Sequence, residues 1–163
     1  VEMSGLPFGL MAEMLDEVNP WRGLLFGETG RLPWSGDPRG VWKTWDEFGI
    51  QGTEFMPWFM ADPPVRTGNP EVLATTYRRA GRSFIALGSW AKTEQSVRLR
   101  VDWARLGLDP ARTRLFAPPI DGMQTEGRWA PDDLIPVAPG RGWWLIADET
   151  APVFELRSRP GSP

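Results

Sequence analysis

The chain has 163 residues, a formal net charge of -3 and 41% hydrophobic residues, which is enough to pack one ordinary domain or two small ones. It has no Cys and no His, which excludes disulfides, cysteine zinc sites, imidazole bases and Ser-His-Asp triads. It has no apolar run of about 18 residues and no basic stripe interleaved with aromatic residues, so the sequence predicts neither a membrane span nor nucleic-acid binding.

Tryptophan, glycine and proline are in excess. The chain has 10 Trp, 18 Gly and 17 Pro, and Gly and Pro together average only about 12% of ordinary proteins. So many helix breakers leave room for few long helices. Indole rings stack on the apolar faces of pyranose rings, so this composition suits a sugar-binding surface, although most Trp residues simply pack cores.

Three elements are predicted in the first third of the chain. Apolar residues from Leu10 to Val18 recur at helical spacing, and Asn19-Pro20 is expected to end that helix. The short apolar run from Trp21 to Gly27 predicts a buried strand. Asp37-Pro38 provides an N-cap and N1 pair for a second helix, with Gly49 just after its end and an apolar stripe of Val41, Trp42, Trp45 and Phe48.

This strand, loop and helix cannot bury both faces of a parallel strand alone, so we expect it to be the tail of a larger α/β domain. The chain begins at Val1 without an initiator Met, and we expect the missing strands to lie upstream. The prolines of Asp62-Pro63-Pro64 mark a boundary. Residues 1–64 are thus predicted to be the tail of an α/β domain, and residues 65–163 a second domain.

The second domain is predicted to be an antiparallel β-sandwich, which makes the whole chain mainly β. Val72–Arg79 and Arg82–Ala91 form a predicted hairpin joined by Ala80-Gly81. The run from Val97 to Trp103 alternates apolar and charged residues, as a strand with one wet face does. Further short strands are expected at Arg114–Ala117, Ile135–Ala138 and Trp143–Ala147.

The tryptophan and Gly-Pro motifs carry a family resemblance that runs from about Gly5 to Ile146. The motifs are Asn19 to Gly27 (NPWRGLLFG), Arg31 to Trp34 (RLPW), Trp42 to Ile50 (WKTWDEFGI), Asn69 to Thr75 (NPEVLAT), Ala86 to Ala91 (ALGSWA) and Asp102 to Pro110 (DWARLGLDP). Together they resemble the C-terminal end of bacterial proteins similar to glycoside hydrolase family 123. In that family a TIM-type catalytic barrel is followed by a β-sandwich.

The resemblance implies a secreted or periplasmic glycosidase that acts on β-linked N-acetylgalactosamine through an adjacent Asp and Glu. The adjacent Asp-Glu pairs of this chain, Asp16-Glu17 and Asp46-Glu47, lie in predicted helices, where neighbouring side chains point about 100° apart. The catalytic roles are therefore not carried onto them, and the catalytic pair is expected upstream of Val1.

Three residues of the loop before the second helix are candidates for the site. Glu28 directly follows the predicted strand, where barrel enzymes collect functional groups, and could act as acid, base or hydroxyl acceptor. Arg31 offers a donor fork and Trp34 a stacking platform for a sugar. Alternatively, Glu28 is an exposed turn residue or the ion-pair partner of Arg31. Trp34 could instead pack over the end of the barrel without binding a sugar.

Other tryptophans are assigned by position. Trp42 and Trp45 share the apolar stripe of the second helix and are expected to pack, and Trp58-Phe59 is expected to join the two domains. Trp143 and Trp144 point to opposite faces of one strand, so one belongs to the core. Trp144 is taken as the exposed residue and as a candidate sugar-binding residue, with Trp129 beside it as an alternative.

The leading hypothesis is the C-terminal portion of a carbohydrate-active glycoside hydrolase, which supplies a wall of the active site and a stabilising β-sandwich but is inactive alone. The expected partners are an oligo- or polysaccharide and the remainder of the catalytic domain, with no cofactor, metal, nucleic acid or membrane. The alternative hypothesis is a non-catalytic carbohydrate-binding or structural module. A third is an interaction domain, since exposed Trp and Arg also suit protein interfaces.

Overall fold

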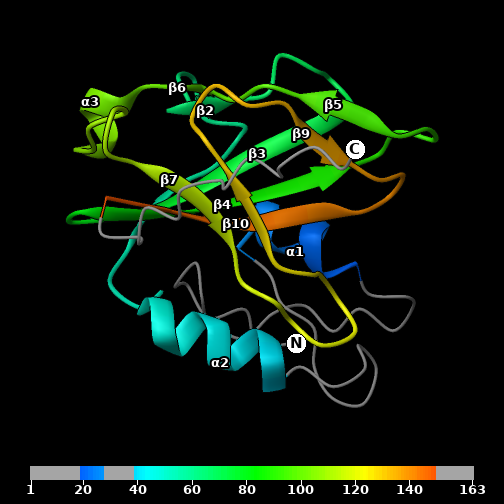
Figure 1. Cartoon of the computed structure of the whole chain (residues 1–163), viewed down its shortest axis with the longest axis horizontal. Helices are drawn as coiled ribbons and strands as arrows, with labels where there is room; N and C mark the ends of the chain where they lie inside the picture. Colours follow the sequence, from blue (N-terminus) through cyan, green and yellow to red (C-terminus); the bar gives the residue numbers. More distant parts are fainter. Residues whose placement is uncertain (1–18, 28–38, 150–163) are drawn as a thin grey trace, which may run out of the picture.

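The computed structural model describes residues 19–27 and 39–149, and Figure 1 shows their arrangement. The helices are α1 (Pro20–Leu25), α2 (Arg39–Phe48) and α3 (Trp103–Leu106). The strands are β1 (Glu54–Met56), β2 (Val65–Arg66), β3 (Val72–Arg79), β4 (Arg82–Ser89), β5 (Gln95–Val97), β6 (Arg100–Val101), β7 (Arg114–Ala117), β8 (Gly127–Trp129), β9 (Ile135–Val137) and β10 (Gly142–Asp148).

Six strands form one antiparallel sheet in the order β1-β3-β4-β10-β7-β8. Its centre is the predicted hairpin of β3 and β4, which pair from Val72↔Ser89 to Arg79↔Arg82. Gly81 turns the chain with φ +76°, a conformation that glycine adopts without a steric penalty. The hairpin is confirmed, although its second strand ends at Ser89 and not at Ala91, and the strand at Arg114–Ala117 is confirmed with its predicted bounds.

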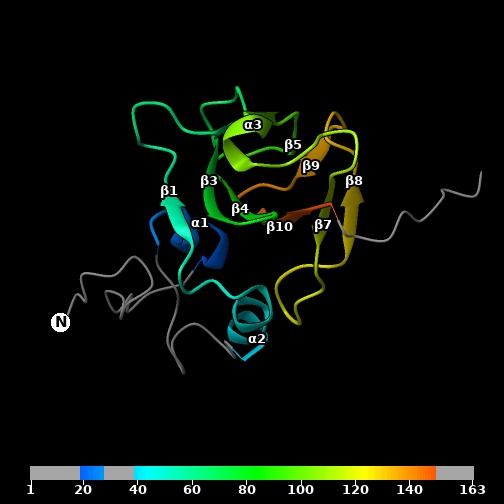
Figure 2. The same cartoon turned by 90° about the vertical axis from the view of Figure 1, so that its left-hand side faces the viewer.

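Two small sheets, β2-β6 and β5-β9, form a second layer over one face of the six-stranded sheet (Figure 2). The core between the layers is aliphatic, with Ile85, Leu87, Val97, Ile135 and Leu145 all nearly inaccessible to solvent. Two β layers around one apolar core make an antiparallel sandwich. The predicted mainly β fold class is confirmed.

The other face of the six-stranded sheet is covered by α1 and α2 (Figures 1 and 2). Its core is aromatic: the Phe84 ring contacts the rings of Phe48, Tyr77 and Trp144 at centroid distances of 5.3, 6.1 and 5.6 Å. The Trp45 ring stacks on Trp144 at 5.8 Å. The sheet therefore separates two hydrophobic cores of different composition.

The prediction of a buried strand over Trp21–Gly27 is wrong, because the segment is helix α1. The side chain of Asn19 accepts a hydrogen bond from Arg22 N at 3.0 Å, and Pro20 occupies the first helical turn. Asn-Pro therefore begins this helix as its N-cap and N1 pair. The apolar residues are continuous because the short helix is buried against the sheet. The helix predicted from Leu10 to Val18, which Asn-Pro is expected to end, lies outside the described residues.

The structure also changes the predicted organisation around two other segments. Strand β1 lies before the expected boundary at residue 64 and pairs with β3, so the six-stranded sheet includes residues from both sides of that position. The run from Val97 to Trp103 keeps the predicted alternation of burial at Val97 and Leu99. It is not one strand, however, because it contributes to β5 and β6 of separate small sheets before α3 begins.

Helix α2 matches the predicted end and apolar stripe except at Trp42, and its predicted cap pair, Asp37-Pro38, lies outside the described residues. The helix ends at Phe48, and Gly49 follows with φ +72°, as a C′ glycine does. Trp45 is 9% exposed and packs as expected, whereas Trp42 is 41% exposed and does not. No helix within the two described stretches is both long and apolar enough to cross a membrane.

Candidate functional site

Helix α1 lies in a shallow patch of the sheet made by two paired glycines, Gly88 of β4 and Gly142 of β10. A Cβ at Gly88 would lie 2.8 Å from Leu25 Cδ1, and one at Gly142 would lie 2.9 Å from Trp21 Cβ. Glycine at both positions therefore leaves room for the helix to approach this closely. The tightest constraint at Gly142 comes from the sheet itself, because the same Cβ would lie 1.8 Å from Leu87 O. We refer to these two residues as the glycine patch.

Hydrogen bonds from the sheet hold the C-terminal end of α1. Thr75 Oγ1 donates to Leu25 O at 2.8 Å, and the Tyr77 hydroxyl donates to Leu24 O. These carbonyls lie at the end of the helix, and both leucines are fully buried. Leu24 O also accepts from Gly27 N at 3.4 Å. Side chains of β3 thereby bond both carbonyls at this end of the helix.

Polar contacts also hold the N-terminal end of α1. Arg22 donates from Nε and Nη2 to Ser89 O at 2.9 and 2.7 Å, and Asn19 donates to Gly140 O. The Arg22 guanidinium lies over the Trp90 ring, 4.8 Å from its centroid. The helix is therefore held at both ends by residues distant in sequence.

Tyr77 is the single tyrosine of the chain and is completely buried under α1. Burial raises the pKa of its hydroxyl well above the ordinary value of 10.0, against a smaller lowering effect of a backbone hydrogen bond from Gly27. The hydroxyl therefore stays protonated and keeps donating to Leu24 O at neutral pH. It acts in structure and not as a base.

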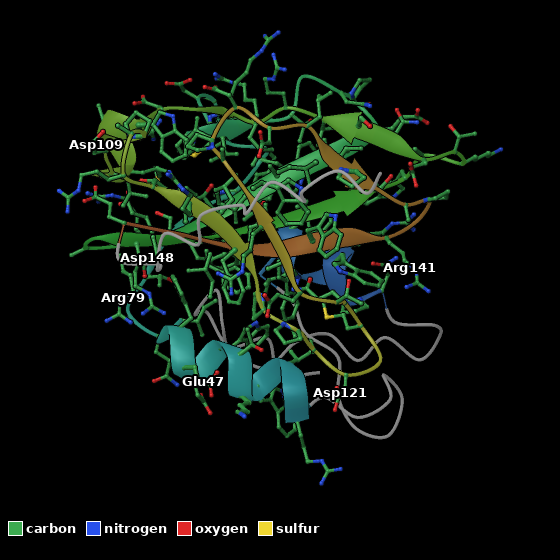
Figure 3. All side chains as sticks on the ribbon, viewed as in Figure 1. Glu47, Arg79, Asp109, Asp121, Arg141 and Asp148 are labelled. Atoms are coloured by element: carbon green, nitrogen blue, oxygen red, sulfur yellow. The ribbon has the colours of Figure 1, made fainter. Side chains whose placement is uncertain are left out.

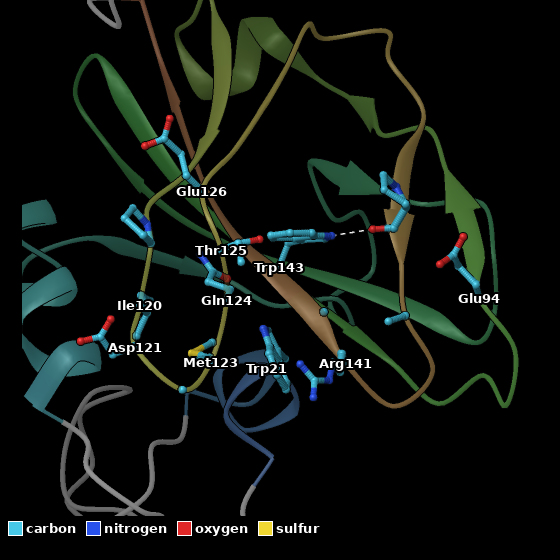
Figure 4. A pocket seen from close by; sticks show the side chains of 15 residues that line it. Trp21, Glu94, Ile120, Asp121, Met123, Gln124, Thr125, Glu126, Arg141 and Trp143 are labelled. Carbon is cyan, nitrogen blue, oxygen red and sulfur yellow. Dashed lines mark hydrogen bonds between the residues drawn. The ribbon is translucent and has the colours of Figure 1, made fainter.

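A groove of about 690 Å³ opens beside the N-terminal end of α1 (Figure 4). One wall is the segment from Pro119 to Glu126 between β7 and β8, and the other includes Pro136 of β9 and Glu94 before β5. Between the walls lie Trp21 of α1 and the start of β10 from Arg141 to Trp143. We call this the Trp143 groove.

The groove exists because β7 leaves β10 halfway along. The two strands pair only from Ile146↔Phe116 to Asp148↔Arg114. At Trp144 the side chain of Gln124 replaces β7: its Oε1 accepts from Trp144 N at 2.9 Å, and its Nε2 donates to Trp144 O at 3.1 Å. The amide of Gln124 thus continues the ladder by one position and holds the groove wall.

Trp143 is half-buried and held firmly. Its Nε1 donates to Pro136 O at 2.6 Å, and its ring makes an edge contact with Trp129 at 5.1 Å. Figure 4 shows the indole extending across the groove from the Gln124 wall toward β9. Nearby, the Arg141 guanidinium lies 5.6 Å from the Trp21 ring centroid. The aromatic part of the lining is therefore fixed in place.

Charged side chains surround this aromatic part. Glu94, Asp121 and Glu126 supply carboxylates and Arg141 a guanidinium, all exposed to solvent. Figure 3 shows Asp121 and Arg141 at the same end of the molecule. Glu126 is paired with Arg128 at 3.0 Å, but no ion pair involves Glu94 or Asp121 in the ranges that the structure describes. Their hydrogen-bonding capacity is free for a ligand.

The site residues predicted from the sequence divide into two groups. Glu28, Arg31 and Trp34 lie outside the described residues, so their roles stay predictions. The reason given for Glu28 has nevertheless changed, because the element that it follows is helix α1 and not a strand. Glu28 therefore can no longer be proposed as a site residue on the ground that it follows a barrel strand.

Trp144 is placed in the aromatic core, 1% exposed, so the prediction that it is the exposed residue of its pair is wrong. In this arrangement it offers no ring face to a sugar. The tryptophan that lines the groove is Trp143, on the opposite face of β10. The alternation along β10 correctly places Trp143 and Trp144 on opposite faces of the sheet. It does not show which of the two faces is buried more deeply by other elements.

Sequence reasoning missed Gln124, Arg141 and both residues of the glycine patch. Gly88 and Gly142 each stand inside a strand pattern, a recognised sign of close backbone approach that could have indicated the patch. Nothing comparable marks Gln124, because its partner Trp144 is fixed by tertiary structure.

The resemblance's carboxylate pair is not found in the described part of the chain. Asp46 and Glu47 lie on the exposed face of α2, and Glu47 pairs with Lys43 at 3.8 Å. No cluster of three or more His, Cys, Asp or Glu suited to a metal ion occurs among residues 19–27 and 39–149.

Two family models match the chain. Residues 37–148 match the model described as "Glycoside hydrolase 123, C-terminal domain", and residues 1–33 match "Glycoside hydrolase 123, TIM-barrel domain". No curated protein was found to match the chain. The resemblance carried by the tryptophan and Gly-Pro motifs is confirmed. Helix α1 falls within the barrel match, and α2 with all ten strands falls within the other.

Proposed function

The chain belongs to the glycoside hydrolase 123 family, and on this premise we propose that it is the C-terminal portion of a glycoside hydrolase whose β-sandwich supports the catalytic barrel. We further propose that the loop after α1 supplies part of the wall of the active site. We expect the catalytic pair to lie in the remainder of the catalytic domain, so this portion alone should be inactive.

One observation carries the support role: α1, which falls within the barrel match, is held by the sheet of the domain that follows. The glycine patch lets Leu25 pack against β4. At the start of α1, Asn19 and Arg22 donate hydrogen bonds to backbone carbonyls of the following domain. At its end, the carbonyls of α1 accept hydrogen bonds from Thr75 and Tyr77 of β3. Because the sheet fixes the position of this helix, the β-sandwich should stabilise the barrel to which the helix belongs.

The test compares Leu25→Asp with Leu134→Asp in a protein that carries the whole barrel together with this chain. A carboxylate at the fully buried Leu25 must be desolvated beneath the sheet, whereas Leu134 is 55% exposed. We expect Leu25→Asp to lower the temperature at which hydrolysis of aryl N-acetyl-β-hexosaminides is lost by several degrees, and Leu134→Asp to leave it unchanged. Equal temperatures for the two variants would contradict the support role.

The proposed wall is supported by position and residue type. Glu28 and Arg31 lie within the barrel match, Trp34 directly follows it, and the segment begins next to Gly27, which ends α1 with φ +79°. A carboxylate, a guanidinium and an indole are the groups that hold sugar hydroxyls and ring faces.

Kinetics test the wall separately from the support role. In the same protein, we expect Glu28→Gln and Trp34→Ala each to lower kcat/KM on those glycosides by about tenfold or more, with no change in thermal stability. Arg31→Ala should raise KM. Unchanged kinetics in all three variants would remove this loop from the active site and leave the support role intact.

A further inference from the structure

We propose that the Trp143 groove is a carbohydrate-binding site that takes a neutral, polyhydroxylated ligand, a mono- or disaccharide unit of a glycan. The proposal rests on the lining of the groove and not on the way in which α1 is held. It can therefore fail or succeed independently of the support role.

The lining combines a fixed aromatic ring with unused polar groups. Trp143 is held by its bond to Pro136 O, so stacking a ligand on its ring costs little side-chain entropy. Around it, Asp121, Glu94 and Arg141 are exposed at the rim. A pyranose presents an apolar C–H face to an indole and hydroxyls at its edge to carboxylates and a guanidinium. The volume of about 690 Å³ lies in the range of small-ligand sites.

The backbone of Gly142 adds a donor and an acceptor at the base of the groove. Ser89 N donates to Arg141 O, and Trp144 bonds to the Gln124 side chain, so alternate residues of β10 face opposite neighbours. Gly142 therefore directs its N–H and C=O to the same side as Trp144, where β7 has already left. Among the described residues no strand pairs with it there. A buried ladder position without a strand calls for a polar ligand or water.

The charges exclude other ligand classes. Glu126 is paired with Arg128, so two unpaired carboxylates, Glu94 and Asp121, face one guanidinium, Arg141. This excess of negative charge disfavours a nucleotide or a phosphorylated ligand. A purely apolar ligand would leave the exposed carboxylates and the Gly142 backbone unpaired or desolvated. A neutral sugar satisfies both the ring face and the hydrogen-bonding rim.

Titration of the isotopically labelled 163-residue chain tests the proposal by NMR. The probes are methyl β-galactoside, methyl β-N-acetylgalactosaminide and a β-linked N-acetylhexosamine disaccharide. We expect at least one probe to shift the Gly142 amide and the Trp143 indole signals saturably, with a Kd in the millimolar range or below, about −4 kcal/mol at 1 mM. The indole signals of Trp42 and Trp45, on helix α2 and outside the groove lining, serve as internal references.

Variants show whether the shift comes from binding in the groove. Asp121→Asn keeps the exposed side chain's shape and should weaken binding about threefold to tenfold, and Trp143→Ala should weaken it about tenfold or more. Trp143→Phe keeps a ring in case the alanine variant does not fold, and should give an intermediate loss. Asp132→Asn and Trp42→Ala are matched controls at exposed positions away from the groove, and should bind like the parent chain.

Two results would overturn the proposal. One is the absence of a saturable shift of Gly142 and Trp143 with all three sugars, or binding that Asp121→Asn and the Trp143 variants leave unchanged. The other is a shift produced by a short alternating Val-Thr peptide and by no sugar, because the groove would then add a strand to β10 instead of binding a glycan.

Discussion

The two faces of the six-stranded sheet are packed with different chemistry. Neighbouring residues of β4 illustrate this: Ile85 belongs to the aliphatic core under the small sheets, and Phe84 to the aromatic core under α1 and α2. Both residues are fully buried. The aliphatic face is covered by strands of its own domain, whereas the aromatic face is covered partly by a helix that falls within the barrel match.

The aromatic face also carries unpaired polar atoms. The buried indole nitrogens of Trp21, Trp45 and Trp144 have no hydrogen-bond partner within residues 19–27 and 39–149. The indole nitrogen of Trp58, which packs at the margin of the aromatic core, also has none there. The aliphatic face has two buried hydroxyls without a partner among the described residues, Thr76 Oγ1 and Ser83 Oγ, but no buried indole nitrogen in that state. The difference teaches that large rings fill the uneven space between a sheet and short helices, at the cost of leaving indole N–H groups unsatisfied.

The largest expected effect comes from truncating one ring at the centre of the aromatic core. Phe84→Ala removes the contacts to Phe48, Tyr77 and Trp144 and should lower the free energy of unfolding by about 3–5 kcal/mol, measured by urea denaturation. Ile85→Ala, its partner on the other face, should cost about 2–5 kcal/mol.

Near-UV circular dichroism separates these two losses. The stacked pair of Trp45 and Trp144 adjoins Phe84, so its signal should fall only in Phe84→Ala, or in Phe84→Leu if the alanine variant does not fold. A loss of this signal in Ile85→Ala alone would show that the two cores are not separated by the sheet.

The glycine patch gives the next largest effect. A Cβ at Gly142 would lie 1.8 Å from Leu87 O, which is backbone and cannot move aside, so Gly142→Ala should cost about 3 kcal/mol. Gly81→Ala is the matched control: it has open space but φ +76°, and should cost about 1 kcal/mol. Equal unfolding midpoints in urea would mean that close approach of the Leu87 backbone is not what requires glycine at position 142.

Alkaline pH should destabilise the aromatic face through Tyr77. Because burial raises the pKa of Tyr77, above about pH 10 the unfolded chain loses the phenolic proton while the folded chain keeps it. The free energy of unfolding should therefore be unaffected by this group below pH 10 and then fall by about 1.4 kcal/mol per pH unit up to the raised pKa.

Tyrosinate absorbance reports this group alone, since the chain has one tyrosine. It should appear together with unfolding and not before it. In Tyr77→Phe the tyrosine-dependent slope should vanish, although the variant loses the bond to Leu24 O and about 1 kcal/mol at neutral pH. A tyrosinate signal that rises near pH 10 in the still folded chain would contradict the predicted burial.

What the sequence predicted well is what local patterns specify. The β3-β4 hairpin follows from two β-rich runs and one glycine turn, and the end of α2 follows from Gly49. The error at α1 has a local cause, because an Asx-Pro pair can stop one helix or cap the next. At Asn19-Pro20 its capping role produces a helix where the apolar run predicts a strand.

The candidate sites depend less on local pattern. The Trp143 groove requires β7 to leave β10 at one residue and Gln124 to replace it, and neither strand's sequence encodes that departure. The position of Trp144 in the core depends in the same way on Trp45, which approaches from a different element. Periodicity assigns residues to faces, but the cover that each face receives is a tertiary property.

The smallest expected effect tests that distinction on one helix. Trp42 and Trp45 share the predicted apolar stripe of α2, yet their exposures are 41% and 9%, because only Trp45 reaches the aromatic core. Trp42→Ala should therefore change the free energy of unfolding by about 0.5 kcal/mol or less, whereas Trp45→Ala, its control, removes a buried ring and should cost about 3–5 kcal/mol. Urea denaturation of the two variants measures the difference directly. Comparable losses would mean that the stripe packs as one surface, as the sequence pattern indicated, and that the aromatic core extends around α2 beyond Trp45.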